Sequence, residues 1–227
     1  MTELERIVHE QRMKVESEEQ QRQFALYIRR ALEEGRQNGF YVASPLGTDK
    51  MEYPFSVNLH PAPISGKPPR FPHKHDFFEM TYVLNGSCYN VFDNYEIILN
   101  QGDLLLMNPE VIHSLYTTSK LDVVFNFLIS EETFRHTFFT LMSDNIISNF
   151  VFDYLYQIQK VSNYLILNCD NNPSLPEVLN RLIIEYYNRL PGYETILEFG
   201  LVQAFSFMAR SCMQQFSAPT SYSSNMR

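Results

Sequence analysis

The chain has 227 residues, 44% of them hydrophobic, so it can bury a core as one large domain or two small ones. Its formal net charge of -8 argues against nucleic-acid binding by these residues alone, because such binding needs a basic face toward the phosphates. The longest apolar runs, such as Leu104–Met107, are far shorter than the roughly 20 residues of a membrane-spanning helix. The charged segment from Glu3 to Arg36 lacks the apolar core of a signal peptide. We therefore expect a cytoplasmic protein that does not enter a membrane.

The first 39 residues predict two helices. Thr2 and Glu5 have the spacing of a capping box, and Ser17 and Gln20 repeat it at the start of the second helix. Gly35 and Gly39 follow as helix stops.

From residue 40 to residue 130 the pattern changes to short runs rich in aromatic and β-branched residues, separated by turn residues. This spacing is typical of an all-β sandwich or barrel. The proline-rich segment from Pro61 to Pro72 is expected to be an extended loop. The predicted strands are Ser56–Leu59, Phe78–Leu84, Ser87–Phe92, Tyr95–Leu99, Asp103–Met107 and Val123–Ile129.

After Ser130 the hydrophobic period becomes helical. Ser174 and Glu177 have capping-box spacing, with Pro176 in the first turn, and predict the start of the third helix of this region. Residues 217–227 lack periodicity and resemble a linker. The fold class is therefore α+β. The predicted helices are Glu131–Leu141, Ile146–Lys160, Ser174–Leu190 and Glu194–Phe216.

The stretch "HKHDFFEMTYVLNG", residues 73–86, gathers polar residues with metal-ligand chemistry. His73 and His75 share one face of a strand, and Glu79 can join them if the chain turns near Asp76. His113, which follows another predicted strand, supplies a fourth side chain. Three imidazoles and a carboxylate suit Zn, Ni, Fe or Mn without choosing among them. The alternative is a polar wall at the mouth of a barrel that binds a small molecule without metal.

Strand parity places Phe77, Thr81 and Val83 on the same face as Glu79. Met80, Tyr82 and Leu84 then lie on the opposite face, toward helices or the exterior. Both sets are largely apolar, so parity leaves open which face lines a pocket. Arg70 and Lys74 flank this stretch, either as anion-recruiting groups or as ordinary solvated charges.

Two motifs in this region resemble those of the cupins. The spacing H-x-H-x3-E-x6-G in residues 73–86 is similar to the first cupin motif. Gly102-Asp103, Pro109 and His113 are similar to the second, although Val111 stands where cupins usually have glycine. The resemblance implies a double-stranded β-helix, the jelly-roll barrel.

A second resemblance covers more of the chain. "HKHDFFEMTYVLNG", "NQGDLLLMNPEVIH" and "FNFLIS", followed by helices, look like the N-terminal sensor region of AraC/XylS-family transcription regulators. The resemblance implies a ligand-sensing barrel at residues 40–130 and a helical dimerisation region at 131–216. Residues 217–227 would link them to a helix-turn-helix DNA-binding domain that lies beyond this chain.

Two functions follow from these patterns. The first is the effector-binding region of a homodimeric AraC-type regulator, with no catalytic residues and with a small molecule such as a sugar held near His73, His75, Glu79 and His113. DNA would be bound only through the missing domain. The alternative is a metal-dependent cupin enzyme, a dioxygenase or isomerase, with the same four residues around the metal.

The cysteines Cys88, Cys169 and Cys212 are odd in number and far apart, which argues against disulfides and against a cysteine zinc site.

Overall fold

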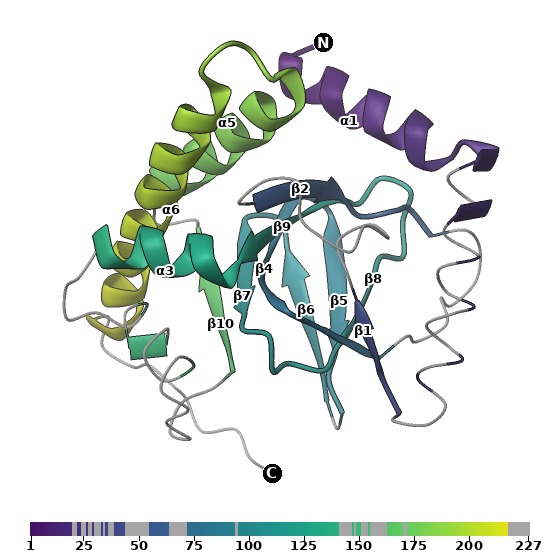
Figure 1. The fold of residues 1–227 in the computed structure, drawn as a ribbon, viewed down its shortest axis with the longest axis horizontal. Helices are drawn as coiled ribbons and strands as arrows, with labels where there is room; N and C mark the ends of the chain where they lie inside the picture. Colours follow the sequence, from purple (N-terminus) through teal and green to yellow (C-terminus); the bar gives the residue numbers. More distant parts are fainter. Residues whose placement is uncertain are drawn as a thin grey trace.

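The computed structural model places helices around two antiparallel β-sheets (Figure 1). It describes residues 1–19, 39–43, 55–63, 72–93, 95–140, 163–169 and 172–217, with isolated residues between 22 and 35 and between 147 and 154. The predicted helix that follows the Ser17 cap, the predicted helix Ile146–Lys160 and the predicted linker at 217–227 lie wholly or mostly outside the described residues. None of the helices in the described ranges is both long and apolar enough to cross a membrane.

The larger sheet has five antiparallel strands in the order β10-β7-β4-β9-β2. The central strand β4 pairs with β7 on one side and with β9 on the other, so both of its edges are hydrogen-bonded. The bounds are Phe55–Leu59 for β2, Phe77–Asn85 for β4, Asp103–Met107 for β7, Val123–Ser130 for β9 and Tyr164–Asn168 for β10.

A three-stranded antiparallel sheet, β6-β5-β8, faces the larger one. Its strands are β5 (Ser87–Val91), β6 (Glu96–Asn100) and β8 (Ser114–Tyr116). A parallel pair, β1 (Tyr41–Ala43) and β3 (His73–His75), completes the strands.

All six predicted strands are present, with ends within one residue of the prediction. Strand β3 confirms the expectation that His73 and His75 share a strand that ends before Asp76. The sequence analysis missed β1 and β8, which have three residues each and are too short to show a period. It also missed β10, which lies within the region predicted to be helical, residues 131–216. Strand β10 exists because β7 offers it a free edge along Asp103–Met107.

Four helices have described bounds: α1 (Glu3–Val15), α3 (Glu131–Thr140), α5 (Ser174–Asn188) and α6 (Tyr193–Ser217). The Thr2–Glu5 capping box at the start of α1 is confirmed, since both reciprocal hydrogen bonds form. Ser130 also caps α3, as its Oγ accepts from the Thr133 main-chain N–H at 3.1 Å.

The predicted capping box at the start of α5 is wrong. Ser174 is the first helical residue, Pro173 occupies the N-cap position, and no side chain caps the helix. The main-chain oxygens of Asn172 and Pro173 instead accept from the N–H groups of Leu175 and Glu177. The helix therefore begins one residue earlier than a Ser174 cap requires.

The larger sheet separates two hydrophobic clusters. One contains Phe78, Met80 and Tyr82 of β4 together with residues of the helices, including Ile7 of α1 and Phe134 of α3. The other lies between the sheets and includes Val83, Leu105 and Met107 of the larger sheet with Cys88 and Leu99 of the smaller one. The predicted parity of β4 is thus confirmed, and the face that carries Glu79 is the interior of the barrel.

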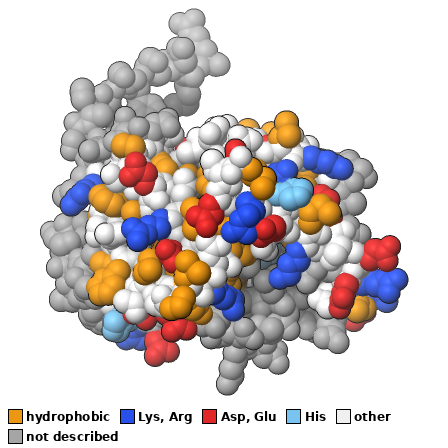
Figure 2. Space-filling model, turned by 90° about the horizontal axis from the view of Figure 1, so that it is seen from above, with side chains coloured by type: hydrophobic (Ala, Val, Ile, Leu, Met, Phe, Trp, Pro, Cys, Tyr) orange, Lys and Arg blue, Asp and Glu red, His pale blue; other side chains and the backbone are white. Residues whose placement is uncertain are grey.

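Helices α1, α5 and α6 form an arc along one side of the strands, and α3 crosses the same side (Figure 1). Arg6 and Arg12 hold α1 in place, since Arg6 donates to Asn188 Oδ1 at the end of α5 and Arg12 to the Asp122 carbonyl before β9. Seen from above, the described residues of this face mix hydrophobic, acidic and basic side chains (Figure 2).

Candidate functional site

Four side chains with metal-ligand chemistry meet at one end of the barrel interior. His73 and His75 lie on β3, and the chain turns at Asp76 before β4 carries Glu79 inward. His113 comes from the segment before β8 and exchanges two main-chain hydrogen bonds with His73, both 2.9 Å long. The sequence predicted this set of four residues, and the fold brings all of them together.

One ligand atom from each residue fits within a sphere the size of a metal site. The four atoms all lie within 4.8 Å of one another. His75 Nε2 is 3.2 Å from His113 Nε2 and 3.1 Å from Glu79 Oε2, and His113 Nε2 is 3.9 Å from the same carboxylate oxygen. We name His73, His75, Glu79 and His113 the three-His/Glu cluster.

Hydrogen bonds behind the cluster orient its side chains. His75 Nδ1 lies 2.9 Å from the main-chain oxygen of Phe77, and His113 Nδ1 lies 2.8 Å from Asn90 Oδ1. Because both partners are acceptors, each Nδ1 carries a proton, and the Nε2 atom of each ring faces the cluster. Thr81 Oγ1 donates to Glu79 Oε1 at 3.2 Å, which leaves Oε2 facing the imidazoles. Partners of this kind are the usual outer sphere of a metal site.

The cluster is almost completely removed from solvent. His75, Glu79 and His113 are 2%, 4% and 1% exposed, whereas His73 is half-buried. Burial alone would raise the pKa of Glu79, but the hydrogen bond from His75 and the nearby imidazoles outweigh it and lower the pKa to about 2. Burial lowers the pKa of His113 well below 6.5. Near neutral pH the cluster thus contains an ionised carboxylate and a neutral His113, which are the protonation states that metal ligands require.

His60 is a further histidine near the cluster, and the sequence analysis did not single it out. It directly follows β2, and its N–H donates to the Val124 carbonyl of β9 at 2.8 Å. Burial lowers the pKa of His60 to about 4, against the opposing influence of the Glu79 charge. Asn90 was missed as well, because its role depends on a contact across 23 residues that no local motif encodes.

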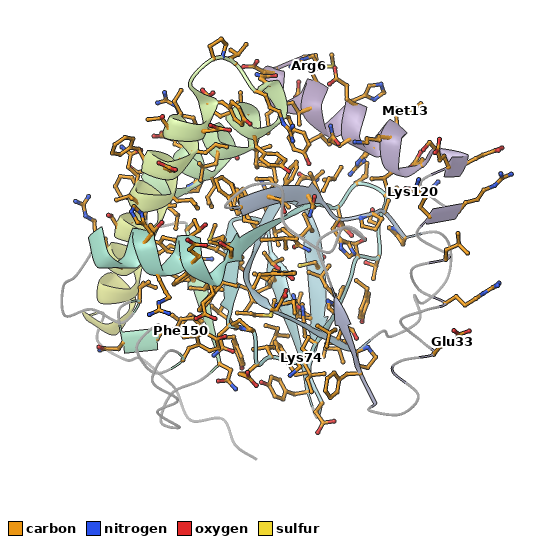
Figure 3. The ribbon with its side chains drawn as sticks, in the orientation of Figure 1. Arg6, Met13, Glu33, Lys74, Lys120 and Phe150 are labelled. Carbon is orange, nitrogen blue, oxygen red and sulfur yellow. The ribbon has the colours of Figure 1, made fainter. Side chains whose placement is uncertain are left out.

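Of the two flanking cations of the sequence analysis, Lys74 lies within the described residues, and it does not line the cluster. Lys74 lies between the two histidines of β3 but points the other way, with its Nζ 5.5 Å from the centroid of the Phe40 ring (Figure 3). Arg70 lies outside the described residues. Lys74 is therefore an outward charge rather than an anion-recruiting group.

The part of the sequence that contains the three-His/Glu cluster matches the model of a known protein family. Residues 66–134 match the family model of the AraC-like ligand binding domain. All four residues of the three-His/Glu cluster fall inside this range. No curated protein sequence matches the chain.

Among solved structures, one has a similar fold over most of the chain, and two further matches are weaker. A structure of apo ToxT from Vibrio cholerae has a TM-score of 0.51 at 18% identity, and the match covers 76% of this chain and 68% of that one. A second ToxT structure from Vibrio cholerae, bound to an unsaturated fatty acid, has a TM-score of 0.46 at 16% identity, covering 74% and 65%. A cupin protein from Bacteroides fragilis has a TM-score of 0.28 at 26% identity, covering 34% and 64%. The chain thus spans about two thirds of the length of ToxT.

The antiparallel sheets, the flanking helices and the family match agree with the jelly-roll fold expected from the sequence. Residues 66–134 are thus similar to the AraC-like ligand binding domain, and the chain has a cupin-like β fold with added helices.

Proposed function

We propose that the chain is the effector-sensing and dimerisation region of an AraC-type transcription regulator, and that its effector binds at the three-His/Glu cluster. The observation that carries this proposal is the position of the cluster inside the AraC-like ligand-binding domain, residues 66–134. An interior cluster of convergent polar groups is the expected form of a small-molecule site in a barrel.

Strand β4 connects the cluster to the helices, because its side chains contact the cluster on one face and the helices on the other. Glu79 faces the interior, while its neighbours Phe78 and Met80 on β4 face the helical side. Phe78 stacks on Phe134 of α3 with ring centroids 3.9 Å apart, and Phe134 contacts Phe205 of α6 at 4.7 Å. An effector that binds better to one arrangement of β4 would therefore favour one arrangement of α3 and α6.

The cluster also suits one divalent transition metal, with Zn, Ni, Fe and Mn as the candidates. The fit rests on the orientation of two imidazoles. With both Nδ1 atoms donating, the Nε2 lone pairs of His75 and His113 face each other at 3.2 Å, an unfavourable contact unless a cation or a proton lies between them. His73, His75, Glu79 and His113 would hold the ion, and it would supply a Lewis acid for an oxygen atom of the effector.

Metal content measured after purification without chelators tests this cluster. We expect about one metal ion per chain in the natural sequence, and a loss of that metal in His75→Ala. His9→Ala is the matched control, because His9 is exposed on α1 and should leave the metal content unchanged. Absence of metal from the unaltered protein would contradict the metal proposal but not effector binding.

A screen of small molecules by thermal denaturation tests the sensor function itself. A true effector should raise the melting temperature of the natural chain and of His9→Ala, but not of His113→Ala. Sugars belong in the first set, as the sequence analysis expects. If no compound class discriminates His113→Ala from His9→Ala, the site proposal fails.

The proposed function also includes two partners, a second copy of the chain and DNA. We expect a cytoplasmic homodimer formed through the helical region, and DNA binding only through a further domain. Sedimentation of the chain should give twice the 26.7 kDa of one copy. A fusion of this chain to a helix-turn-helix DNA-binding domain should bind DNA as a dimer, whereas this chain alone should not bind DNA.

The alternative function is a metal-dependent cupin enzyme, a dioxygenase or an isomerase. The four-ligand set favours it, since the same residues that would anchor an effector could hold a reactive metal. Oxygen uptake and isomer formation by metal-loaded protein are the tests. Turnover that disappears in His75→Ala would support the enzyme, and a metal-loaded protein without turnover would leave the sensor function.

A further inference from the structure

Phe77 is the first residue of β4 and directly follows the turn at Asp76. Its side chain is 3% exposed, so it is buried as deeply as the residues of the core. Among the described residues, however, it belongs to neither of the two hydrophobic clusters that the larger sheet separates. Alternation along β4 places its ring on the interior face, with Glu79. A ring that is buried outside both hydrophobic clusters has its packing partner elsewhere.

That partner is the imidazole of His75. The two rings stack with their centroids 4.5 Å apart and their planes 12° from parallel. The main-chain oxygen of Phe77 also lies 2.9 Å from His75 Nδ1 and accepts a hydrogen bond from it. One residue therefore contacts His75 twice. Its carbonyl determines that Nδ1 carries a proton, and its ring restrains the plane of the imidazole.

The near-parallel stack differs from the other ring contacts of the three-His/Glu cluster. The imidazoles of His73, His75 and His113 meet one another at interplanar angles of 43° to 82°. Rotation of the His75 ring out of its plane would break the stack and the carbonyl hydrogen bond together. Because both contacts oppose that rotation, Nε2 of His75 stays 3.1 Å from Glu79 Oε2 and 3.2 Å from His113 Nε2.

A stacked phenyl ring also favours a positive charge on the imidazole. The face of the phenyl ring carries partial negative charge and attracts cations. An imidazole that donates its Nε2 lone pair to a metal ion becomes more positive, so its contact with Phe77 strengthens when the ion binds. Both side chains are buried, which reduces screening by water. The stack should therefore raise metal affinity in addition to stabilising the fold.

We propose that Phe77 is a positioning residue of the three-His/Glu cluster, which holds the His75 imidazole in the plane needed for metal binding and stabilises that imidazole once a divalent transition metal is bound. This inference rests on the metal binding proposed above and adds a residue that controls its affinity. Phe77 acts through His75 and does not itself contact the ion.

Titrations with Ni²⁺ and Co²⁺ test the proposal on the natural chain, Phe77→Leu and Phe127→Leu. Phe77→Leu removes the ring but keeps the main-chain oxygen that accepts from His75. Phe127→Leu makes the same change at a completely buried phenylalanine of β9 that faces the helices, across the sheet from the cluster. We expect the dissociation constant to rise about 2- to 30-fold in Phe77→Leu, the range of one cation–π contact. Phe127→Leu should keep the dissociation constant of the natural chain.

The visible absorption of bound Co²⁺ separates a positioning role from a structural one, because its bands depend on the geometry of the ligands. In Phe77→Leu the bands should shift or broaden, since His75 is no longer held in one plane. Phe77→Tyr keeps the ring and should restore the spectrum and the affinity of the natural chain. If Phe77→Leu does not fold, Phe77→Met removes the ring in favour of a flexible apolar side chain and carries the same comparison.

The possible outcomes distinguish this inference from the proposed metal site. Equal affinities and identical Co²⁺ spectra for Phe77→Leu and the natural chain would overturn the inference and leave the metal site in place. Equal losses of affinity in Phe77→Leu and Phe127→Leu would mean that the ring serves only the fold, which would also overturn it. A natural chain that binds neither ion would overturn the metal site itself, and this inference with it, before any variant is compared.

Discussion

The two faces of the five-stranded sheet share every strand and every main-chain hydrogen bond, yet they differ in composition. Toward the helices, β4 presents Phe78, Met80 and Tyr82, each no more than 3% exposed. Toward the interior, the same strand presents Glu79, Thr81 and Val83. One face is a continuous apolar core, and the other mixes apolar residues with an ionised carboxylate.

This difference in composition indicates that the helical face stabilises the fold and that the interior face binds ligands. Burial of large apolar side chains on the helical face supplies stability at about 25 cal/mol per Å². Polar groups on the interior face contribute little or cost free energy unless they find partners. Substitutions on the two faces should therefore separate loss of folding from loss of binding.

The largest effect is expected from the helical face. Phe78→Ala removes a completely buried ring that stacks on Phe134 and contacts Phe150 edge-on. The free energy of unfolding should fall by about 3–5 kcal/mol, as for other buried phenylalanines. Urea denaturation measures it, with Ile98→Ala, 53% exposed, as a control that should change stability by less than about 0.5 kcal/mol. A similarly small change for Phe78→Ala would contradict the assignment of the core.

On the interior face, metal should stabilise the natural chain but not Glu79→Gln. A ligand present at a hundred times its dissociation constant adds about 2.7 kcal/mol to the free energy of unfolding. Glu79→Gln keeps the shape of the side chain and removes the charge that faces His75. Denaturation with and without Zn²⁺ or Ni²⁺ measures the difference, and equal stabilisation of both proteins would refute a role for Glu79 as a ligand.

Asn90 should influence the same site through His113. Asn90→Leu removes the acceptor that keeps the proton on His113 Nδ1, so metal affinity should fall about 10- to 100-fold, as for other outer-sphere partners. Asn90→Asp preserves the acceptor and should recover most of the affinity. Metal titrations that give equal affinities for Asn90→Leu and the natural chain would remove Asn90 from the site.

The buried interior should also make the metal-free protein sensitive to acid. The pKa values of His60 and His113 are lower in the folded protein than the usual 6.5, so below pH 6.5 the unfolded chain binds more protons and stability falls. The loss of stability caused by His60 extends down to about pH 4. The pKa of Glu79 is lowered from 4.5 to about 2, so protonation of the unfolded chain at Glu79 lowers stability further below pH 4.5. Denaturation should show a loss of at least about 2 kcal/mol between pH 6.5 and 4.5, which is the share expected from His60 alone. A flat profile there would contradict the burial of these histidines.

The smallest effect is expected at Lys74, which separates the two histidines in sequence but faces Phe40. Lys74→Ala should lower the free energy of unfolding by no more than about 1 kcal/mol and leave metal affinity unchanged. Thermal denaturation and metal titration check both statements. A marked loss of metal affinity would place Lys74 nearer the cluster than its strand parity allows.

Much of the site was predictable because its main signals are local. The spacing of His73, His75 and Glu79 anticipated a turn near Asp76, and alternation along β4 separated Glu79 from Met80 and Tyr82. Asn90 and His60 were not predictable in this way, because they reach the cluster from other strands and belong to no motif. Strand β10 escaped prediction for a related reason, since its five residues are a strand only beside β7.

The sequence by itself determined the longer strands of the barrel, the helices that flank it and the identity of the four cluster residues, because periodicity, capping and motif spacing act over a few residues. Only the tertiary structure decided what surrounds them: the two main-chain hydrogen bonds between His73 and His113, the Asn90 acceptor and the pairing of Asn126 with Thr81. These contacts join residues far apart in the chain, and their free energy is gained only when the sheets close around a common interior.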